Sequence, residues 1–459
     1  MIHIDYLSQM MIQSNYQNND EGKEVIMNIV VDFVLNEFLA KPVILLGLLI
    51  GIGYILKREK GTKVITGTIS AMVGVQMILF GGGQFAGMFQ PIVAAVNEVT
   101  GVSGYLMDSY AMRVTSQEAL GERFALMGYT FLLAFAINLL FVFFGKYTGA
   151  KGIFLTGNAG TAHAQGMLWL VLANLLVTNA IAVIIAGVIL GIYWSYSTTL
   201  AIKTCEEVTD GAGFTIGHNQ QIGIWFFGKL APFFGKKEQD AENLKLPGWL
   251  SIFNNNVVAV CIIMWIFIGA FMIPLGTSGI QELAGNDHWI MYLITLGIRF
   301  SMMMVILLTG VRMMCAELAE SFKGIQEKVV PHAVPAIDVA ALLPFSPNAA
   351  TLGFIFCAIG TAISIGILVL VRSPIMVLPG FIPLFFSGGP IGVVANKKGG
   401  IKAIMVCGIL LGMIQSFGTV WAIHLMRYPE GMGWSGMFDL STLWPAITQI
   451  MSWIGALIR

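Results

Sequence analysis

The segment Glu206–Pro232 reads EEVTDGAGFTIGHNQQIGIWFFGKLAP and separates two long apolar regions. Its first sixteen residues contain two glutamates, an aspartate, a histidine and an Asn-Gln-Gln run. Gly211, Gly213 and Gly217 interrupt any long helix, so the segment does not cross a bilayer as one continuous rod. Irregular backbone is tolerated at membrane depth only where it is buried in protein or lines a cavity. The segment is therefore a candidate solute pathway, and its neutral donors and acceptors suit a hydroxyl-rich solute better than a bare ion.

The composition predicts a membrane protein. Of the 459 residues, 56% are hydrophobic and 11% are charged, and the mean hydropathy is +0.80. Soluble domains carry about 25% charged residues, so we predict an all-α polytopic membrane protein embedded in a lipid bilayer. The 25 basic and 25 acidic residues balance, which gives no reason to expect a nucleic-acid partner. The five cysteines show no CxxC spacing, and we predict neither a metal site nor a cofactor.

Apolar runs separated by polar or Gly/Pro-rich segments predict ten or eleven transmembrane helices, together with re-entrant or broken segments. A basic cluster at 57–63 indicates that the first span ends in the cytoplasm. The expected organisation is a polar N-terminal extension over 1–24, an N-terminal transmembrane repeat over 25–234, a cytoplasmic linker loop over 235–250, a C-terminal transmembrane repeat over 251–430 and a final transmembrane helix over 431–459.

Two glycine-rich stretches suggest local irregularities. Gly81–Gly83 lies inside an apolar run and predicts a kink, a close helix contact or a cavity-lining break. Ser373–Asn396 is rich in proline and glycine, which is typical of a hairpin or a re-entrant pair.

A weak internal repeat relates the two halves. GIFLTGN at 152–158 resembles PIMVLPGF at 374–381, and a lone aspartate lies upstream of each. The separations Asp108–Gly157 and Asp338–Gly380 are similar, at 49 and 42 residues. Paired Gly/Pro-broken segments in matching halves predict a transporter site at the interface between structural repeats, which are inverted if each repeat has an odd number of spans.

Each candidate polar residue also has an ordinary structural explanation. His218 either contacts a solute or packs between helices, and Asp338 either binds a solute, pairs with a basic side chain or caps a helix. Asp108 either belongs to the site or caps the helix that begins near Ser109. Tyr110 either contacts the solute or lies in an interfacial aromatic belt.

Several motifs resemble the membrane IIC component of the bacterial phosphotransferase system, ascorbate-specific type. They are EEVTDGAGFTIGHNQQ (206–221), FFGKKEQDAENLKLPGWLSIFNNN (233–256), GVRMMCAELAESFKGI (310–325), AVPAIDVAALLPFSPNA (333–349) and LPGFIPLFFS (378–387). The resemblance covers nearly the whole chain from about residue 40 onward, and together these motifs are specific.

This resemblance implies a fold, a mechanism and partners. Two inverted five-helix repeats form a core domain and a V-shaped dimerisation domain, so a homodimer in the bacterial cell (inner) membrane is expected. The core binds a sugar acid, L-ascorbate or a similar one, and carries it inward by an elevator-like movement. A cytoplasmic IIB protein, itself served by IIA, then phosphorylates the solute from a phosphocysteine, so no catalytic residue is expected in this chain.

The resemblance also implies a substrate-binding set. The residues carried over by position are Ser109, Tyr110, His218, Asn219 and Asp338. After Leu155 the family pattern is Thr-Gly-His followed by glutamine, whereas this sequence has Asn158 in place of that histidine, with His163 and Gln165 a few residues later. Either His163 takes over through a local shift or the site lacks that imidazole. Asn158, His163 and Gln165 therefore join the candidate substrate-binding residues.

Other functions remain as alternatives. The chain could be a IIC component for another solute, such as galactitol, or an ion-coupled secondary transporter in which Asp338 or His218 relays protons. A membrane-embedded enzyme is disfavoured, because the sequence contains no HExxH, GxSxG or recognisable nucleophile–base spacing.

Overall fold

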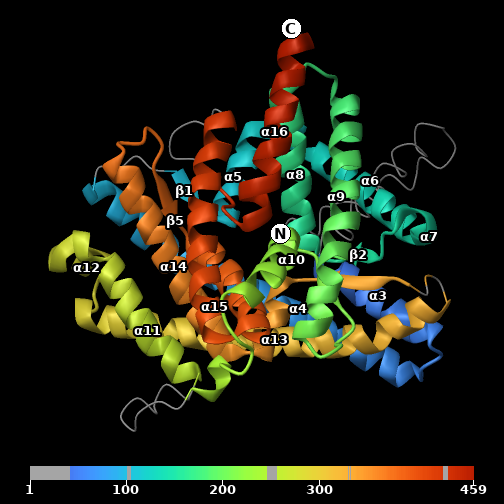
Figure 1. Cartoon of the computed structure of the whole chain (residues 1–459), viewed down its shortest axis with the longest axis horizontal. Coiled ribbons are helices and arrows are strands. Elements are labelled where there is room, and N and C mark those ends of the chain that lie inside the picture. The colour runs from blue at the N-terminus through green and yellow to red at the C-terminus, as the bar shows by residue number, and fades with distance from the viewer. Residues whose placement is uncertain are drawn as a thin grey trace, which may run out of the picture.

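The computed structural model describes residues 42–100, 105–244, 256–328, 330, 332–426 and 433–458. The predicted extension over 1–24 and the second part of the predicted linker, 245–250, lie outside these residues. The described chain is almost entirely helical (Figure 1), which confirms the predicted all-α class.

The elements form two series of similar composition. The first comprises α3 (Pro42–Leu56), α4 (Gly61–Thr100), β1 (Tyr105–Met107), α5 (Ser109–Leu120), α6 (Leu126–Phe143), α7 (Gly145–Thr148), β2 (Gly152–Phe154), α8 (Gly157–Asn174), α9 (Asn179–Val208), β3 (Thr215–Ile216) and α10 (Gln221–Leu230). The second comprises α11 (Asn256–Phe271), α12 (Gly276–Ala284), α13 (Trp289–Lys328), β4 (Val334–Ile337), the 3-10 helix η8 (Val339–Phe345), α14 (Pro347–Leu370), β5 (Val377–Pro379), α15 (Phe381–Met426), β6 (Gly433–Trp434) and α16 (Phe438–Ile458).

Several helices have the length and hydropathy needed to cross a membrane. Among the described residues they are Leu126–Phe143, Asn179–Val208, Trp289–Ile306, Pro347–Leu370 and Ile382–Met426, and the bent pair Met264–Phe271 with Ile273–Ala284 gives a sixth if it is one span. This confirms a multi-pass membrane protein. The predicted total of ten or eleven spans stays a prediction, because helices such as α3, with 15 residues, are too short to meet the same criterion alone.

Two small parallel sheets join the halves. β1 lies between β5 and β6, with Tyr105 opposite Val377, and β4 lies between β2 and β3, with Gly152 opposite Val334. Each sheet thus takes its central strand from one series and its outer strands from the other. Exchanging β1 with β4, β2 with β5 and β3 with β6 converts one sheet into the other. This pattern is the structural form of an internal repeat.

The repeat expected from the sequence agrees with this exchange. Asp108 directly follows β1 and Asp338 directly follows β4. The two long helices α4 and α13 also correspond, since each precedes one of these strands and each has 40 residues. By the same order, β6 and α16 take the places of β3 and α10. The residue bounds of the predicted domains stay predictions.

The helices pack in two groups. α3, α4, α11 and α13 contact one another, and α6, α8, α9, α14, α15 and α16 form the second group. In Figure 1, α13 crosses the lower part of the view, whereas α9 and α16 run upright. The basic cluster after α3 is held to α13, because Lys57 Nζ lies 3.3 Å from Glu320 Oε1 and Lys63 Nζ lies 3.0 Å from Glu317 Oε2.

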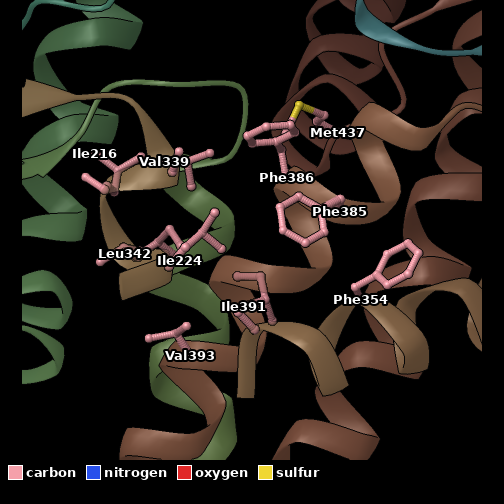
Figure 2. Close-up of a cluster of buried hydrophobic side chains, with 14 of the residues drawn as sticks. Ile216, Ile224, Val339, Leu342, Phe354, Phe385, Phe386, Ile391, Val393 and Met437 are labelled. Atoms are coloured by element: carbon pink, nitrogen blue, oxygen red, sulfur yellow. The ribbon is translucent and has the colours of Figure 1, made fainter. Parts of the chain in front are cut away.

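A hydrophobic core supports the segments that carry the candidate residues (Figure 2). Ile216 and Ile224, on either side of the polar loop at 217–221, are buried with Val339 from η8 and with Phe385 and Phe386 from α15. The polar loop is therefore anchored at both ends by apolar packing.

Two local expectations differ from the structure. α4 continues through Gly81–Gly83, so of the three predicted alternatives the break is wrong, while the kink and the close helix contact stay predictions. Ser373–Asn396 contains β5 and the start of α15, so the predicted hairpin does not form within these residues, and the re-entrant alternative stays a prediction. The reversal lies instead at Gly400, whose φ of 69° is unfavourable for other residues and whose added Cβ would lie 2.6 Å from Gln239 O.

Candidate functional site

The polar segment is broken as the sequence predicts. α9 ends at Val208, and Asp210, Gly211 and Gly213 adopt φ values of 53°, 82° and 79° that reverse the chain. β3 then pairs with β4, and Gly217 N donates to Ile337 O at 2.8 Å. This pairing brings the loop that begins at His218 next to Asp338.

His218 and Asp338 form a partly buried polar pair. His218 Nε2 lies 3.9 Å from Asp338 Oδ2, and their side chains are 12% and 18% exposed. Asp338 Oδ1 accepts a hydrogen bond from Ala340 N at 2.9 Å, so the expected helix cap is present and the second oxygen faces His218. His218 Nδ1 is buried and has no hydrogen-bond partner among the described residues. Since buried polar atoms are normally satisfied, this nitrogen is available to a ligand.

A second set of side chains surrounds Asn219. Trp194 Nε1 donates to His163 Nδ1 at 3.0 Å. The proton of the neutral imidazole must therefore be on Nε2, which donates to Asn219 Oδ1 at 2.7 Å. Asn219 Nδ2 lies 3.5 Å from Ser109 Oγ and 3.3 Å from Ser435 Oγ. His163 is fully buried and both of its ring nitrogens are hydrogen-bonded, so it contacts the loop through Asn219 from within the protein.

The remaining candidates occupy different places. Gln165 is buried and donates to Arg113 O at 3.0 Å and to Ser116 Oγ at 2.8 Å, which attaches α8 to α5. Tyr110 lies in the first turn of α5 and Asn158 in the first turn of α8. Ser109, His163 and Asn219 therefore form one group of contacting residues. His218 and Asp338 form another. The two groups are adjacent because His218 and Asn219 are consecutive in the sequence.

Sequence reasoning missed Asp439 and Tyr193. Asp439 is completely buried, and its Oδ2 accepts hydrogen bonds from Tyr193 Oη at 2.7 Å and from Ile222 N at 3.2 Å. A usable signal was present, because Asp439 is a lone acidic residue at the start of an apolar run, as Asp338 is. Tyr193 lies within a strongly apolar span, where its sequence carries no comparable signal.

Seven further buried side-chain polar atoms lack hydrogen-bond partners among the described residues, and two of them bear on this loop. These two are Gln220 Oε1 in the loop and Ser387 Oγ in α15. Gln220 Nε2 donates to Phe386 O at 2.9 Å, so the loop and this turn of α15 are neighbours. Together with His218 Nδ1, these atoms leave unused hydrogen-bonding capacity beside the loop, as a site for a polar solute requires.

The sheets also gather helix N-termini. In each sheet all strands are parallel, and every strand is followed by a helix: α15, α5 and α16 after one sheet, and α8, η8 and α10 after the other. Carboxyl ends of parallel strands meet at one edge, so three helix starts converge at each edge. Helix N-termini carry partial positive charge and free N–H groups, so these edges favour anionic groups.

Comparison with known proteins agrees with this architecture. Residues 37–446 match the family described as PTS system sugar-specific permease component. A Mycoplasma pneumoniae protein named ascorbate-specific PTS system EIIC component is 29% identical over 435 residues, which cover 85% of this chain and 66% of that protein. The chain therefore spans just under two thirds of the length of this relative. With its multi-pass helical fold, this chain belongs to the family of sugar-specific permease components of the phosphotransferase system.

Proposed function

We propose that this chain is the membrane (IIC) subunit of a phosphoenolpyruvate-dependent phosphotransferase system in a bacterial cell membrane, and that it binds and translocates L-ascorbate or a similar sugar acid. The observation that carries the proposal is the group of buried polar atoms without partners beside the loop at 217–221, above all His218 Nδ1. The name of the Mycoplasma pneumoniae relative supports the choice of ascorbate.

The chemistry of the loop suits a hydroxylated monoanion. Asp338 Oδ2 can accept a hydrogen bond from a solute hydroxyl, and His218 Nδ1 can donate to an ene-diolate or lactone oxygen when it carries the proton. The negative charge of the solute is favoured by the helix N-termini that converge at the sheet edges. Neutral hydrogen-bonding groups supply most of the recognition, so a solute that lacks a matched hydroxyl leaves buried groups unpaired and binds poorly.

In this proposal, translocation requires a movement of this chain, and phosphorylation requires separate cytoplasmic proteins. The division of the helices into two packed groups supports an elevator-like displacement of one group against the other. The cysteines whose side chains the structure describes, Cys205, Cys261, Cys357 and Cys407, are buried or partly buried, which supports a phosphocysteine on a separate cytoplasmic IIB protein, charged by IIA. We also propose that the chain forms a homodimer.

Uptake of labelled L-ascorbate tests the proposal. Vesicles carrying the full chain would be supplied with phosphoenolpyruvate and the cognate cytoplasmic proteins, and the internal product would be identified. We expect ascorbate phosphate to accumulate with the wild type, and at least tenfold less with Asp338→Asn or His218→Ala. Asp210→Asn makes the same chemical change as Asp338→Asn at an exposed loop position and should retain full uptake. Accumulation of unmodified ascorbate without IIB would overturn the phosphotransferase proposal.

One alternative follows from the His218–Asp338 pair, which can hold a proton between its members. An ion-coupled transporter would deliver free solute, need no IIB and lose accumulation when an ionophore is added. If another solute such as galactitol is phosphorylated and ascorbate is not, the permease assignment stands and the substrate assignment is wrong.

A further inference from the structure

Asp439 is a buried carboxylate that no cation neutralises among the described residues. It is 0% exposed, and its hydrogen-bond donors are the Tyr193 hydroxyl at 2.7 Å, Ile222 N at 3.2 Å and Gly223 N at 3.1 Å. An isolated charge in such a place is costly, so a buried carboxylate inside a membrane protein is retained for a reason.

The contacts of Asp439 enclose the polar loop. Its backbone N donates to Asn219 O at 3.1 Å, while its carboxylate accepts from the amides of Ile222 and Gly223. Asp439, at the start of α16, is therefore hydrogen-bonded to the backbone on both sides of Gln220 and Gln221. The two accepted amides belong to the first turn of α10, whose partial positive charge stabilises the carboxylate.

Tyr193 connects Asp439 to His218 through Gln221. Its hydroxyl lies 2.7 Å from Asp439 Oδ2 and 3.2 Å from Gln221 Oε1, and the same Oε1 accepts from His218 N at 3.2 Å. A continuous chain of contacts thus leads from Asp439 to the backbone of His218. The adjacent Trp194 acts on Asn219 through His163, so α9 supports both solute-facing residues from consecutive positions.

We propose that Asp439, together with Tyr193, is a positioning residue that fixes the loop at 217–221 so that His218 and Asn219 can bind the solute. The inference rests on the proposed function, since it deepens the account of that same site. Asp439 does not itself contact the solute, because its carboxylate is occupied by the loop amides and the tyrosine hydroxyl. It also occupies the start of α10, so a solute anion must be held at another helix start.

Asp439→Asn is the informative variant. Asparagine has nearly the same shape, but its NH2 group cannot accept, so either Ile222 N or Gly223 N is left without a partner. Losing one hydrogen bond to a charged acceptor corresponds to a roughly tenfold to hundredfold weaker solute affinity if the loop is displaced. Tyr193→Phe removes the hydroxyl contacts with Asp439 Oδ2 and Gln221 Oε1 but leaves both loop amides bonded to the carboxylate, so it should produce a smaller loss. Ser441→Ala is the control, because Ser441 is also buried, lies two residues farther along α16 and has its hydroxyl 3.3 Å from Thr419 Oγ1, away from the loop.

Two measurements on the full chain in lipid nanodiscs test the inference. Equilibrium binding of labelled L-ascorbate gives Kd, and amide hydrogen exchange of a peptide covering 217–224 reports the loop without any solute. We expect Asp439→Asn to raise Kd and to accelerate exchange in this peptide alone, while Ser441→Ala changes neither. Wild-type Kd and exchange in Asp439→Asn would overturn the inference, as would accelerated exchange throughout the chain. Faster loop exchange in a protein whose wild type binds no ascorbate would sustain the positioning role and refute the proposed substrate.

Discussion

His163→Leu offers a quantitative test of the support behind Asn219. Leucine fills much of the imidazole volume but removes two hydrogen bonds, one from Trp194 Nε1 at 3.0 Å and one to Asn219 Oδ1 at 2.7 Å. All three side chains are buried, so water cannot replace the lost partner. Each buried group left unpaired costs about 1–3 kcal/mol. We therefore expect the variant to lose about 2–6 kcal/mol of stability.

The same variant should weaken solute binding, because Asn219 is free to turn away from Ser109 and Ser435. A reorientation cost of about 1.4 kcal/mol corresponds to a tenfold rise in Kd. Thermal unfolding of the detergent-solubilised chain and binding of labelled L-ascorbate measure the two effects. Thr448→Val is the control, because it removes a buried hydroxyl whose hydrogen bond, to Trp444 O, stays within its own helix.

A double-mutant cycle with Asn219→Ala isolates the pairwise contribution. If His163 acts through Asn219, the two substitutions are not additive, and the interaction energy should reach about 1–3 kcal/mol. An interaction energy within about 0.5 kcal/mol of zero would show that His163 does not hold Asn219. In that case the geometry of this contact would not explain any loss of binding.

Two further predictions concern packing and buried polarity. Gly360→Ala places a Cβ against Ile409 O, where α14 meets α15, and should lower stability by about 1–3 kcal/mol; Gly366→Ala on the same helix meets no atom within 4 Å and should be neutral or slightly stabilising in the same unfolding assay. Asn138→Leu should lower stability by about 1–3 kcal/mol, because Phe154 N, which donates to Asn138 Oδ1 at 2.9 Å, is left unpaired, whereas Gly152 O keeps the Thr198 hydroxyl as a donor. Equal melting temperatures for Gly360→Ala and Gly366→Ala, or a wild-type melting temperature for Asn138→Leu, would contradict these estimates.

Local sequence properties determined the class of protein and part of the site. The scarcity of charge in long apolar runs requires a membrane environment, because such runs cannot remain exposed to water. Gly211 and Gly213 adopt positive φ values where the chain reverses after α9, a conformation that glycine allows at little steric cost, so the position of the polar loop could be predicted from the sequence. The lone aspartates Asp108 and Asp338 mark corresponding places in the two halves, because each follows a short strand directly.

Other predictions failed where local signals are ambiguous. The glycines at 81–83 do not break α4, because a glycine inside a helix lowers stability without excluding the helical conformation. The reversal in α15 lies at Gly400 and not within 373–396, at a positive φ and a close approach to Gln239 O that both favour glycine. The assignment of Gln165 to the site, by contrast, stays a prediction; the structure shows that its amide hydrogen-bonds to α5.

Tertiary structure alone decided which distant residues act together. Tyr193 and Asp439 are 246 positions apart, and no local pattern relates them, yet they share a hydrogen bond of 2.7 Å. The exchange of strands between the two sheets is equally long-range, since β1 finds its partners in β5 and β6 of the other half. Sequence periodicity reports which face of an element is apolar, but not which of many apolar faces it meets. Composition and glycines therefore determined the membrane fold and the broken loop, whereas packing between the halves decided which buried groups hold His218 and Asn219 in place.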